Sequence, residues 1–282
     1  MTVPNRSSVL RLFGDGQGAL GTVRSAGLTR LGAALSLGGA RKQYGDPAAN
    51  EDAVLLCETE TGCFFALADG HNGAEGAHLA LNWLLHNRAE YWAANGPGAL
   101  DLPQVATDAF RCINHLIWCQ NRDQGSSFRT TLSMGLIGSS HRDVFVASVG
   151  DSHIFAVDSE SCRPVAVSPT AGSYFLGASE EPSLPVAPNC AFDTLSTSGL
   201  HAVVIASDGI SSPGIGFRDP ASEVFAATNA ALQQGSRFGS PASLAAAIAM
   251  AACGSQRANQ SGDNISVAAV TFVHPPGGER RR

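Results

Sequence analysis

Lysine is almost missing from this 282-residue sequence: Lys42 is the only one, and every other basic side chain is an arginine. The 18 basic residues are outnumbered by 24 acidic residues, which leaves a formal net charge of −6. A protein that binds nucleic acid or an anionic membrane surface usually presents an excess of basic side chains. We therefore expect neither nucleic acid nor a membrane as a partner.

The sequence also lacks any Cys-x-x-Cys pair, and its cysteines are odd in number, seven. A disulfide framework and a cysteine-bound zinc site are therefore not expected. Most of these cysteines stand among apolar residues, where a free thiol packs as a small hydrophobic side chain. This pattern favours a reducing compartment, and we predict a cytoplasmic location.

No apolar run approaches the ~18 residues that are needed to cross a bilayer. Residues 1–30 mix small, polar and glycine residues without a sustained period, which predicts a flexible N-terminal arm. The first 42 residues are rich in Arg, Ser and Gly, so an organelle transit peptide is the less favoured alternative. No change of composition divides the rest, and we predict one domain over 31–274 and a disordered tail over 275–282.

Segments with the spacing of strands and helices alternate in blocks along this domain. Strands are expected over 31–40 and over 52–70, where a turn at 58–62 separates two apolar runs. Helices are expected from about 74 to 92 and after Pro103. The remaining expected elements are strands at 130–137, 144–149, 154–157 and 165–167, a loop at 168–189, a strand at 201–209, helices at about 220–234 and 241–253, and a strand at 261–273. Blocks of hairpin-connected strands with helices between them predict an α+β fold, an α-β-β-α sandwich of two central antiparallel β-sheets flanked by pairs of helices.

Acidic residues recur where apolar strands begin or end. Six of them, spread over more than two hundred residues, share this position: Glu51, Asp52, Asp69, Asp151, Asp208 and Asp263. If these strand ends meet at one edge of the sandwich, the carboxylates repel one another, and bound cations would relieve the repulsion. Oxygen ligands without cysteine favour Mg²⁺ or Mn²⁺. A single Asp-Gly pair is more typical of a turn, and His71 alone of a surface histidine, so the metal site is predicted from the joint pattern.

Six segments, five of which contain these residues, carry a resemblance to a known family. In chain order they are NEDA (50–53), FFALADGHNGAEGA (64–77), TTLSMGLI (130–137), VASVGDSHIFAV (146–157), VVIASDGI (203–210) and SGDNISVAAVTF (261–272). Over about 50–273 the chain resembles the metal-dependent protein phosphatases of type 2C. The ordered combination of Asp-Gly-His, Val-Gly-Asp-Ser, Ser-Asp-Gly and Gly-Asp-Asn makes this resemblance highly specific.

The resemblance implies hydrolysis of phosphoserine and phosphothreonine in proteins, with two Mg²⁺ or Mn²⁺ ions and a weaker third. Asp69 would bridge two ions, and the backbone carbonyl of Gly70 would bind one of them. Asp52 would orient a metal-bound water, and His71 would protonate the leaving alkoxide. The further ligands that the resemblance implies are Asp208 and Asp263 for the first ion, Glu51 for the second, mostly through water, and Asp151 for the third.

Several features depart from the family pattern. Pro47 stands where the family usually has the arginine that holds the substrate phosphate, so Arg41 or Lys42 is the candidate to take over that contact. The glycine that usually precedes Thr-Thr is Arg129, a less favoured candidate for the same contact. The subdomain that usually follows the Val-Gly-Asp-Ser segment is shortened to 168–189. His153 stands where an arginine is usual, and we interpret it as structural.

These departures leave three functions open. An active protein-serine/threonine phosphatase that acts in signalling is favoured, because every matched metal carboxylate is present. A pseudophosphatase that binds a phosphoprotein without turnover is the first alternative, suggested by Pro47 and Arg129. A phosphatase for a small phosphorylated molecule is the second, since a shortened subdomain offers less surface to a protein. We expect a monomer whose partner is its phosphorylated protein substrate.

Overall fold

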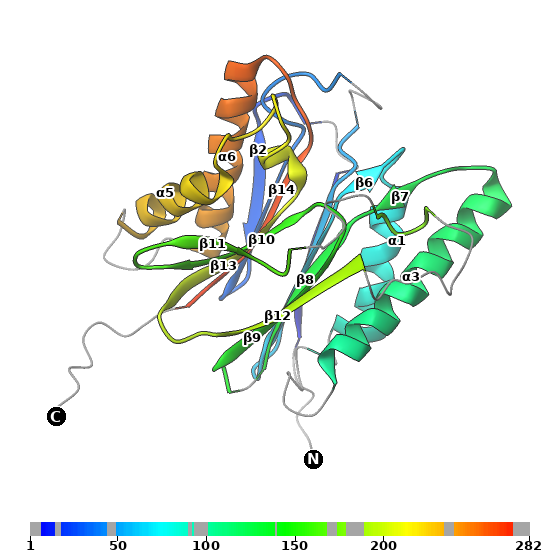
Figure 1. Cartoon of the computed structure of the whole chain (residues 1–282), viewed down its shortest axis with the longest axis horizontal. Coiled ribbons are helices and arrows are strands. Elements are labelled where there is room, and N and C mark those ends of the chain that lie inside the picture. The colour runs from blue at the N-terminus through cyan, green and yellow to red at the C-terminus, as the bar shows by residue number, and fades with distance from the viewer. Residues whose placement is uncertain are drawn as a thin grey trace.

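Two antiparallel sheets of six strands each form the centre of the fold (Figure 1). The structure is a computed structural model that describes residues 7–14, 18–43, 49–89, 92, 101–138, 140–167, 174–178, 189–233 and 240–272. The first sheet has the strand order β1 (Ser8–Phe13), β4 (Ala53–Glu58), β5 (Cys63–Ala68), β8 (Leu132–Ile137), β9 (Asp143–Val149) and β12 (Cys190–Ser196). The second has the order β11 (Cys162–Val165), β10 (His153–Asp158), β13 (Leu200–Ala206), β14 (Ile265–Thr271), β3 (Leu31–Ser36) and β2 (Val23–Gly27).

The central strands are apolar on both faces because both faces are covered. In β5, Phe65 and Leu67 belong to the core between the two sheets, whereas Phe64 and Ala66 belong to a second core under helices. Successive side chains of a strand point to opposite faces, so an unbroken apolar run serves both cores. This arrangement explains why 52–70 reads as continuous apolar sequence around its turn.

Helices cover the outer face of each sheet. The first sheet is covered by α1 (Glu75–Leu84), which continues into the π-helical turn η1 (Leu85–Ala89), and by α3 (Leu102–Gln124). The second is covered by α5 (Pro220–Gln233) and α6 (Pro241–Asn259). Figure 1 shows α5 and α6 on the left of the sheets and α1 and α3 on the right. The predicted α-β-β-α sandwich is confirmed.

Two strands lie in the segment predicted to be a flexible arm. Strand β1 pairs with β4 at the edge of the first sheet, and β2 pairs with β3 at the edge of the second. The prediction is therefore wrong for Ser8–Phe13 and Val23–Gly27. These edge strands bury few side chains, so their sequences lack the continuous apolar pattern that marks the central strands.

Other expected elements differ at their boundaries. Helix α6 continues to Asn259, beyond the expected end at 253, and β12 was not expected at all. The loop predicted at 168–189 is described only at 174–178 and at Asn189, and the tail predicted at 275–282 lies outside the described residues. Among the described helices, none is both long and apolar enough to cross a membrane.

Candidate metal centre

Strand pairing brings the acidic residues of the first sheet together. Ala53 at the start of β4 is paired with Ala68 at the end of β5. Asp52 and Asp69, the residues next to this pair, therefore lie at the same edge of the sheet. Asp52 is 1% exposed and Asp69 is 6% exposed, so both carboxylates are withdrawn from bulk water.

The remaining aspartates reach this edge from other strand ends. They are Asp151 between β9 and β10, Asp208 in the short 3-10 helix η3 (Asp208–Ile210) after β13, and Asp263 before β14. Burial raises the pKa of Asp69 well above its usual value, and the charges of Asp52, Asp208, Asp263 and Asp151 raise it further. The structure thus gathers the predicted aspartates into one electrostatically coupled cluster.

Asp69 and Gly70 are held by the backbone of the neighbouring segment. Thr131 N and Thr130 Oγ1 donate to the Asp69 carbonyl at 2.9 and 2.8 Å, and Asp69 N donates to Thr131 Oγ1 at 3.1 Å. Gly70 begins the two-residue strand β6 (Gly70–His71), which pairs with β7 (Arg129–Thr130). A Cβ at position 70 would lie 2.4 Å from the backbone oxygen of Glu51, so only glycine allows this close approach.

Asp69, His71 and Asp151 each offer a ligand atom within 4.8 Å of the others. His71 Nε2 lies 3.8 Å from Asp69 Oδ1, which is an ion-pair distance rather than a hydrogen bond. Burial raises the pKa of Asp151 to about 7, and the charges of Asp208 and Asp263 contribute. Its Oδ1 atom is buried and accepts no hydrogen bond within the described part of the chain.

Asp52 is almost fully buried. Neither of its side-chain oxygens accepts a hydrogen bond of normal geometry from any described residue. Burial raises the pKa of Asp52 to about 7; the Asp263 charge adds to this, whereas Lys42 and the nearby hydroxyl groups of Ser266 and Ser207 oppose it. A buried carboxylate without a donor is costly unless a cation or water occupies the space beside it.

Glu51 is oriented by two contacts, one to each oxygen of its carboxylate. Its Oε1 atom accepts a hydrogen bond from Gly73 N at 2.6 Å, and its Oε2 atom lies 2.7 Å from Lys42 Nζ. Lys42 Nζ also lies 3.2 Å from Asp263 Oδ1. Among the candidate phosphate contacts, Lys42 is thus buried between predicted metal ligands, whereas the neighbouring Arg41 is exposed.

His71 lies between the cluster and a cation. Its ring contacts Phe175 edge-on at 4.4 Å between centroids, and Arg129 Cζ lies 5.1 Å from the centroid of the same phenyl ring. Burial lowers the pKa of His71; the charge of Asp208 opposes this shift and that of Arg129 adds to it. Phe175 comes from the shortened segment after β11, whose neighbour Leu176 forms a bridge with Thr130.

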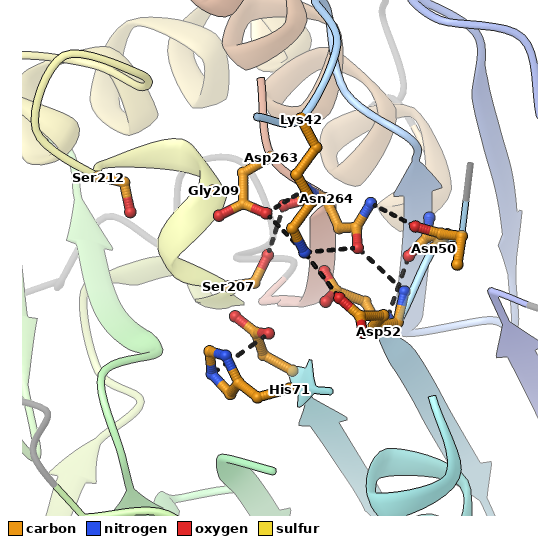
Figure 2. Close-up of polar contacts among 12 residues, drawn as sticks. Lys42, Asn50, Asp52, His71, Ser207, Gly209, Ser212, Asp263 and Asn264 are labelled. Atoms are coloured by element: carbon orange, nitrogen blue, oxygen red, sulfur yellow. Dashed lines mark hydrogen bonds and ion pairs between the residues drawn. The ribbon is translucent and has the colours of Figure 1, made fainter. Parts of the chain in front are cut away.

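Two amide side chains outside the predicted set organise the site. Asn264 Oδ1 accepts hydrogen bonds from Glu51 N at 3.0 Å and Lys42 Nζ at 3.4 Å, so it ties the Glu51 segment to the start of β14 (Figure 2). Asn264 follows Asp263 in the Gly-Asp-Asn segment. Its polar side chain next to a buried strand is the feature by which the sequence could have identified it as a site residue.

The second organising amide, Gln256 of α6, is fully buried. Its Nε2 atom donates to the carbonyls of Gly209 and Asp263 at 2.8 and 3.1 Å, and its Oε1 atom accepts from Gly39 N at 2.8 Å. One side chain therefore connects three loops that carry or flank the acidic residues. Only its position on an otherwise apolar helix face marks it in the sequence.

Hydroxyl groups support the remaining predicted residues. Ser212 Oγ donates to Asp208 Oδ2 at 2.7 Å, and the His153 ring forms a short hydrogen bond with Ser211 Oγ. His153 is half-buried and its ring stacks on Phe155 at 5.7 Å between centroids. Burial lowers the pKa of His153, and the Asp208 charge opposes this shift. Pro47 lies outside the described residues.

The cluster fits divalent cations of the hard type. Its donors are carboxylate oxygens and a glycine carbonyl, and the buried oxygens of Asp52 and Asp151 lack donors in the described part of the chain. Mg²⁺ and Mn²⁺ prefer such oxygen ligands. Bound cations would offset the burial and the mutual repulsion that raise the pKa values of Asp52, Asp69 and Asp151.

Solved structures with similar folds were found among bacterial phosphatases. The catalytic domain of the serine/threonine protein phosphatase PstP, in complex with two manganese ions, aligns with a TM-score of 0.60 and 19% identity over 89% of this chain and 99% of that chain. A structure of PstP from Mycobacterium tuberculosis aligns with a TM-score of 0.59 and 19% identity over 89% of this chain and 99% of that chain. Stp1 from Staphylococcus aureus gives 0.57 and 13% identity, with 96% of each chain covered. At these identities the comparisons establish the fold.

Sequence comparison extends this result to the family. The comparison with curated proteins gave no significant match. Residues 40–250, more than half of the chain, match the family described as Protein phosphatase 2C. Asp263 and Asn264 lie beyond the matched segment, and the fold brings them to the same cluster. Because the family match covers more than half of the chain and the fold agrees with it, the chain belongs to the protein phosphatase 2C family.

Proposed function

We propose that this protein hydrolyses phosphoserine and phosphothreonine in proteins by a metal-dependent reaction. The convergence of acidic side chains from separate strand ends on one buried edge supports this activity best. Membership in the protein phosphatase 2C family points to the same reaction, and the two manganese ions bound to the PstP catalytic domain point to the same cofactors. We place the activity in the cytoplasm, in a monomer that dephosphorylates a signalling protein.

The ligands of the ions would come from both sheets. Two Mg²⁺ or Mn²⁺ ions would be held by Asp69, the Gly70 carbonyl, Glu51, Asp208 and Asp263, and a weaker third ion by Asp151. Such ions, when bound, supply a water molecule of lowered pKa and positive charge beside the phosphoryl oxygens. No cysteine is required as a nucleophile.

Asp52 would orient the attacking water, and His71 would act as the proton donor. Asp52, whose buried oxygens accept no hydrogen bond from the described residues, would accept one from the attacking water. His71 Nε2, likewise without a hydrogen-bond partner among them, would donate a proton to the serine or threonine oxygen as its bond to phosphorus breaks. The products would be the free hydroxyl of the protein and inorganic phosphate.

Arg129 is the cation that we place on the substrate phosphate. It is the cross-strand partner of His71, and its Nε atom makes no hydrogen bond within the described residues. A guanidinium group binds phosphate oxygens through two parallel hydrogen bonds. Arg41, which is exposed, would add long-range attraction.

The test is hydrolysis of a phosphothreonine peptide and of a small aryl phosphate, each with Mn²⁺ and with a chelator. We expect Mn²⁺-dependent turnover that Asp208→Asn reduces by at least about a hundredfold, because the variant removes a charged ligand. Asp123→Asn, which removes an exposed surface carboxylate, is the matched control and should retain full activity. Mn²⁺ binding without turnover of either substrate would contradict the proposal and favour a phosphoprotein-binding role, and preference for the aryl phosphate would favour a small-molecule substrate.

A further inference from the structure

The only lysine of the chain is buried inside the acidic cluster. Lys42 Nζ lies 2.7 Å from Glu51 Oε2 and 3.2 Å from Asp263 Oδ1, and it donates to Asn264 Oδ1 at 3.4 Å. The exposed fractions of the Lys42, Glu51 and Asp263 side chains are 6%, 4% and 8%. Figure 2 shows the Lys42 side chain directed toward Asp263 and Asn264 from the loop after β3.

The backbone holds Lys42 in this position. Lys42 forms a parallel bridge with Gly262, which precedes Asp263. A Cβ at position 262 would lie 1.8 Å from the Ala40 carbonyl oxygen, so the two segments are packed as closely as glycine permits. The direction of the Lys42 side chain is therefore set by a close backbone contact, in contrast to the exposed neighbour Arg41.

We propose that Lys42 is an internal counter-cation that competes with the divalent ions for Glu51 Oε2 and Asp263 Oδ1. This inference rests on the proposed metal-dependent function and adds a property of this chain's own residues. In the metal-free protein the ammonium group neutralises part of the cluster. Binding of a divalent ion at these oxygens requires that the ammonium group leaves them.

The contacts of the two acidic residues support direct competition. Glu51 Oε1 already accepts a hydrogen bond from Gly73 N, and Asp263 Oδ1 also accepts one from Asn264 N at 2.8 Å. Lys42 therefore contacts the Glu51 oxygen that the Gly73 hydrogen bond leaves, Oε2, and shares Asp263 Oδ1 with Asn264 N. An ammonium group and a divalent ion cannot occupy the same space between these oxygens.

Two ion positions of unequal affinity follow from this arrangement. The Lys42 ammonium group partly neutralises Glu51 and Asp263, whereas Asp151 Oδ1 accepts no hydrogen bond within the described residues. Lys42 would thereby make occupancy of the weaker position dependent on the metal concentration.

Titration calorimetry of the full chain with Mn²⁺, beside thermal unfolding in a chelator, tests the inference. Lys42→Met is expected to tighten the weaker Mn²⁺ site about tenfold or more and to lower the melting temperature in the chelator, since the carboxylates lose their counter-charge. Saturating Mn²⁺ should restore its melting temperature to the wild-type value. Arg41→Met, which removes the same charge from the adjacent exposed position, should change neither quantity.

A variant that retains the charge separates loss of the counter-cation from a purely structural effect. Lys42→Arg keeps a cation beside the carboxylates, so the Mn²⁺ affinity of the weaker site should stay as low as in the wild type. Unchanged or weakened Mn²⁺ binding in Lys42→Met would overturn the counter-cation role, and Mn²⁺-dependent turnover by the wild type would show that the proposed function still stands. Failure of the wild type and of every variant to bind Mn²⁺ would overturn both.

Discussion

His71 and Arg129 are directly opposite each other in the two-stranded ribbon formed by β6 and β7. Phe175 contacts both side chains, so the ring and the guanidinium group are fixed relative to each other. Burial lowers the pKa of His71, and the Arg129 charge adds to this effect while Asp208 opposes it. The pair therefore couples the proposed proton donor to the proposed phosphate contact.

Replacing Arg129 is expected to change both binding and pH dependence. In Arg129→Met the pKa of His71 rises because one neighbouring positive charge is gone. A proton donor is active only while it is protonated, so the alkaline limb of the kcat profile should move to higher pH. KM for a phosphothreonine peptide should rise about tenfold, as for loss of one charged hydrogen bond. Arg122→Met, at an exposed ion pair, should leave the profile unchanged; an unmoved limb in Arg129→Met would argue against His71 as the donor.

Metal removal should make stability depend on pH. The pKa values of Asp52 and Asp151 are raised from 3.8 to about 7, which means that the folded protein binds these protons more tightly than the unfolded chain does. Their contribution to stability is complete below about pH 4 and is lost as the pH rises through about 7. In a chelator the melting temperature should therefore fall over this window relative to that of the Mn²⁺-loaded protein.

The increase in melting temperature caused by Mn²⁺ should accordingly be larger at pH 7.5 than at pH 5.5, since the ion binds the deprotonated carboxylates. Asp52→Asn should reduce the pH dependence in the chelator, and the exposed Asp123→Asn should not. Equal stabilisation by Mn²⁺ at both pH values would contradict the burial of uncompensated carboxylates.

Gln256→Leu should destabilise the protein and loosen the metal site together. The substitution leaves Gly39 N and the carbonyls of Gly209 and Asp263 without the partner they have now. A buried backbone group that loses its hydrogen bond costs about 1–3 kcal/mol, so we expect a loss of at least about 2 kcal/mol in urea unfolding. Calorimetry should show weaker Mn²⁺ binding. Gln104→Leu on the exposed face of α3 should change neither the free energy of unfolding nor the Mn²⁺ affinity. Wild-type stability and Mn²⁺ affinity in Gln256→Leu would show that Gln256 does not hold the loops of the site.

Two glycine substitutions should have opposite effects. A Cβ at Gly209 would lie 1.9 Å from the Asn264 carbonyl oxygen, so Gly209→Ala must displace the loop that carries Asp208. It is expected to lower both the free energy of unfolding and the Mn²⁺ affinity. Gly254, exposed in α6, has no neighbouring atom within 4 Å of such a Cβ. Gly254→Ala should raise the free energy of unfolding by about 0.5–1 kcal/mol through helix propensity alone. Chemical denaturation distinguishes the two, and stabilisation by both would show that the Gly209 loop is not tightly packed.

The sequence by itself determined the layers of the fold and the type of site. Apolar runs such as 63–68 mark buried strands because side-chain alternation is a local property, and carboxylates at strand ends mark an edge where charges can meet. Asp52, Asp69, Asp151, Asp208 and Asp263 could therefore be selected before their arrangement was known.

Only the tertiary structure decided what surrounds these carboxylates. The edge strands β1 and β2 depend on partners elsewhere in the chain, and their own sequences bury few side chains. Likewise, Lys42 contacts Asp263 across more than two hundred residues, and Gln256 of α6 reaches Gly39 in the loop after β3. Such contacts follow from strand order and loop packing, which no local pattern encodes, so the sequence did not show that Lys42 lies between two carboxylates.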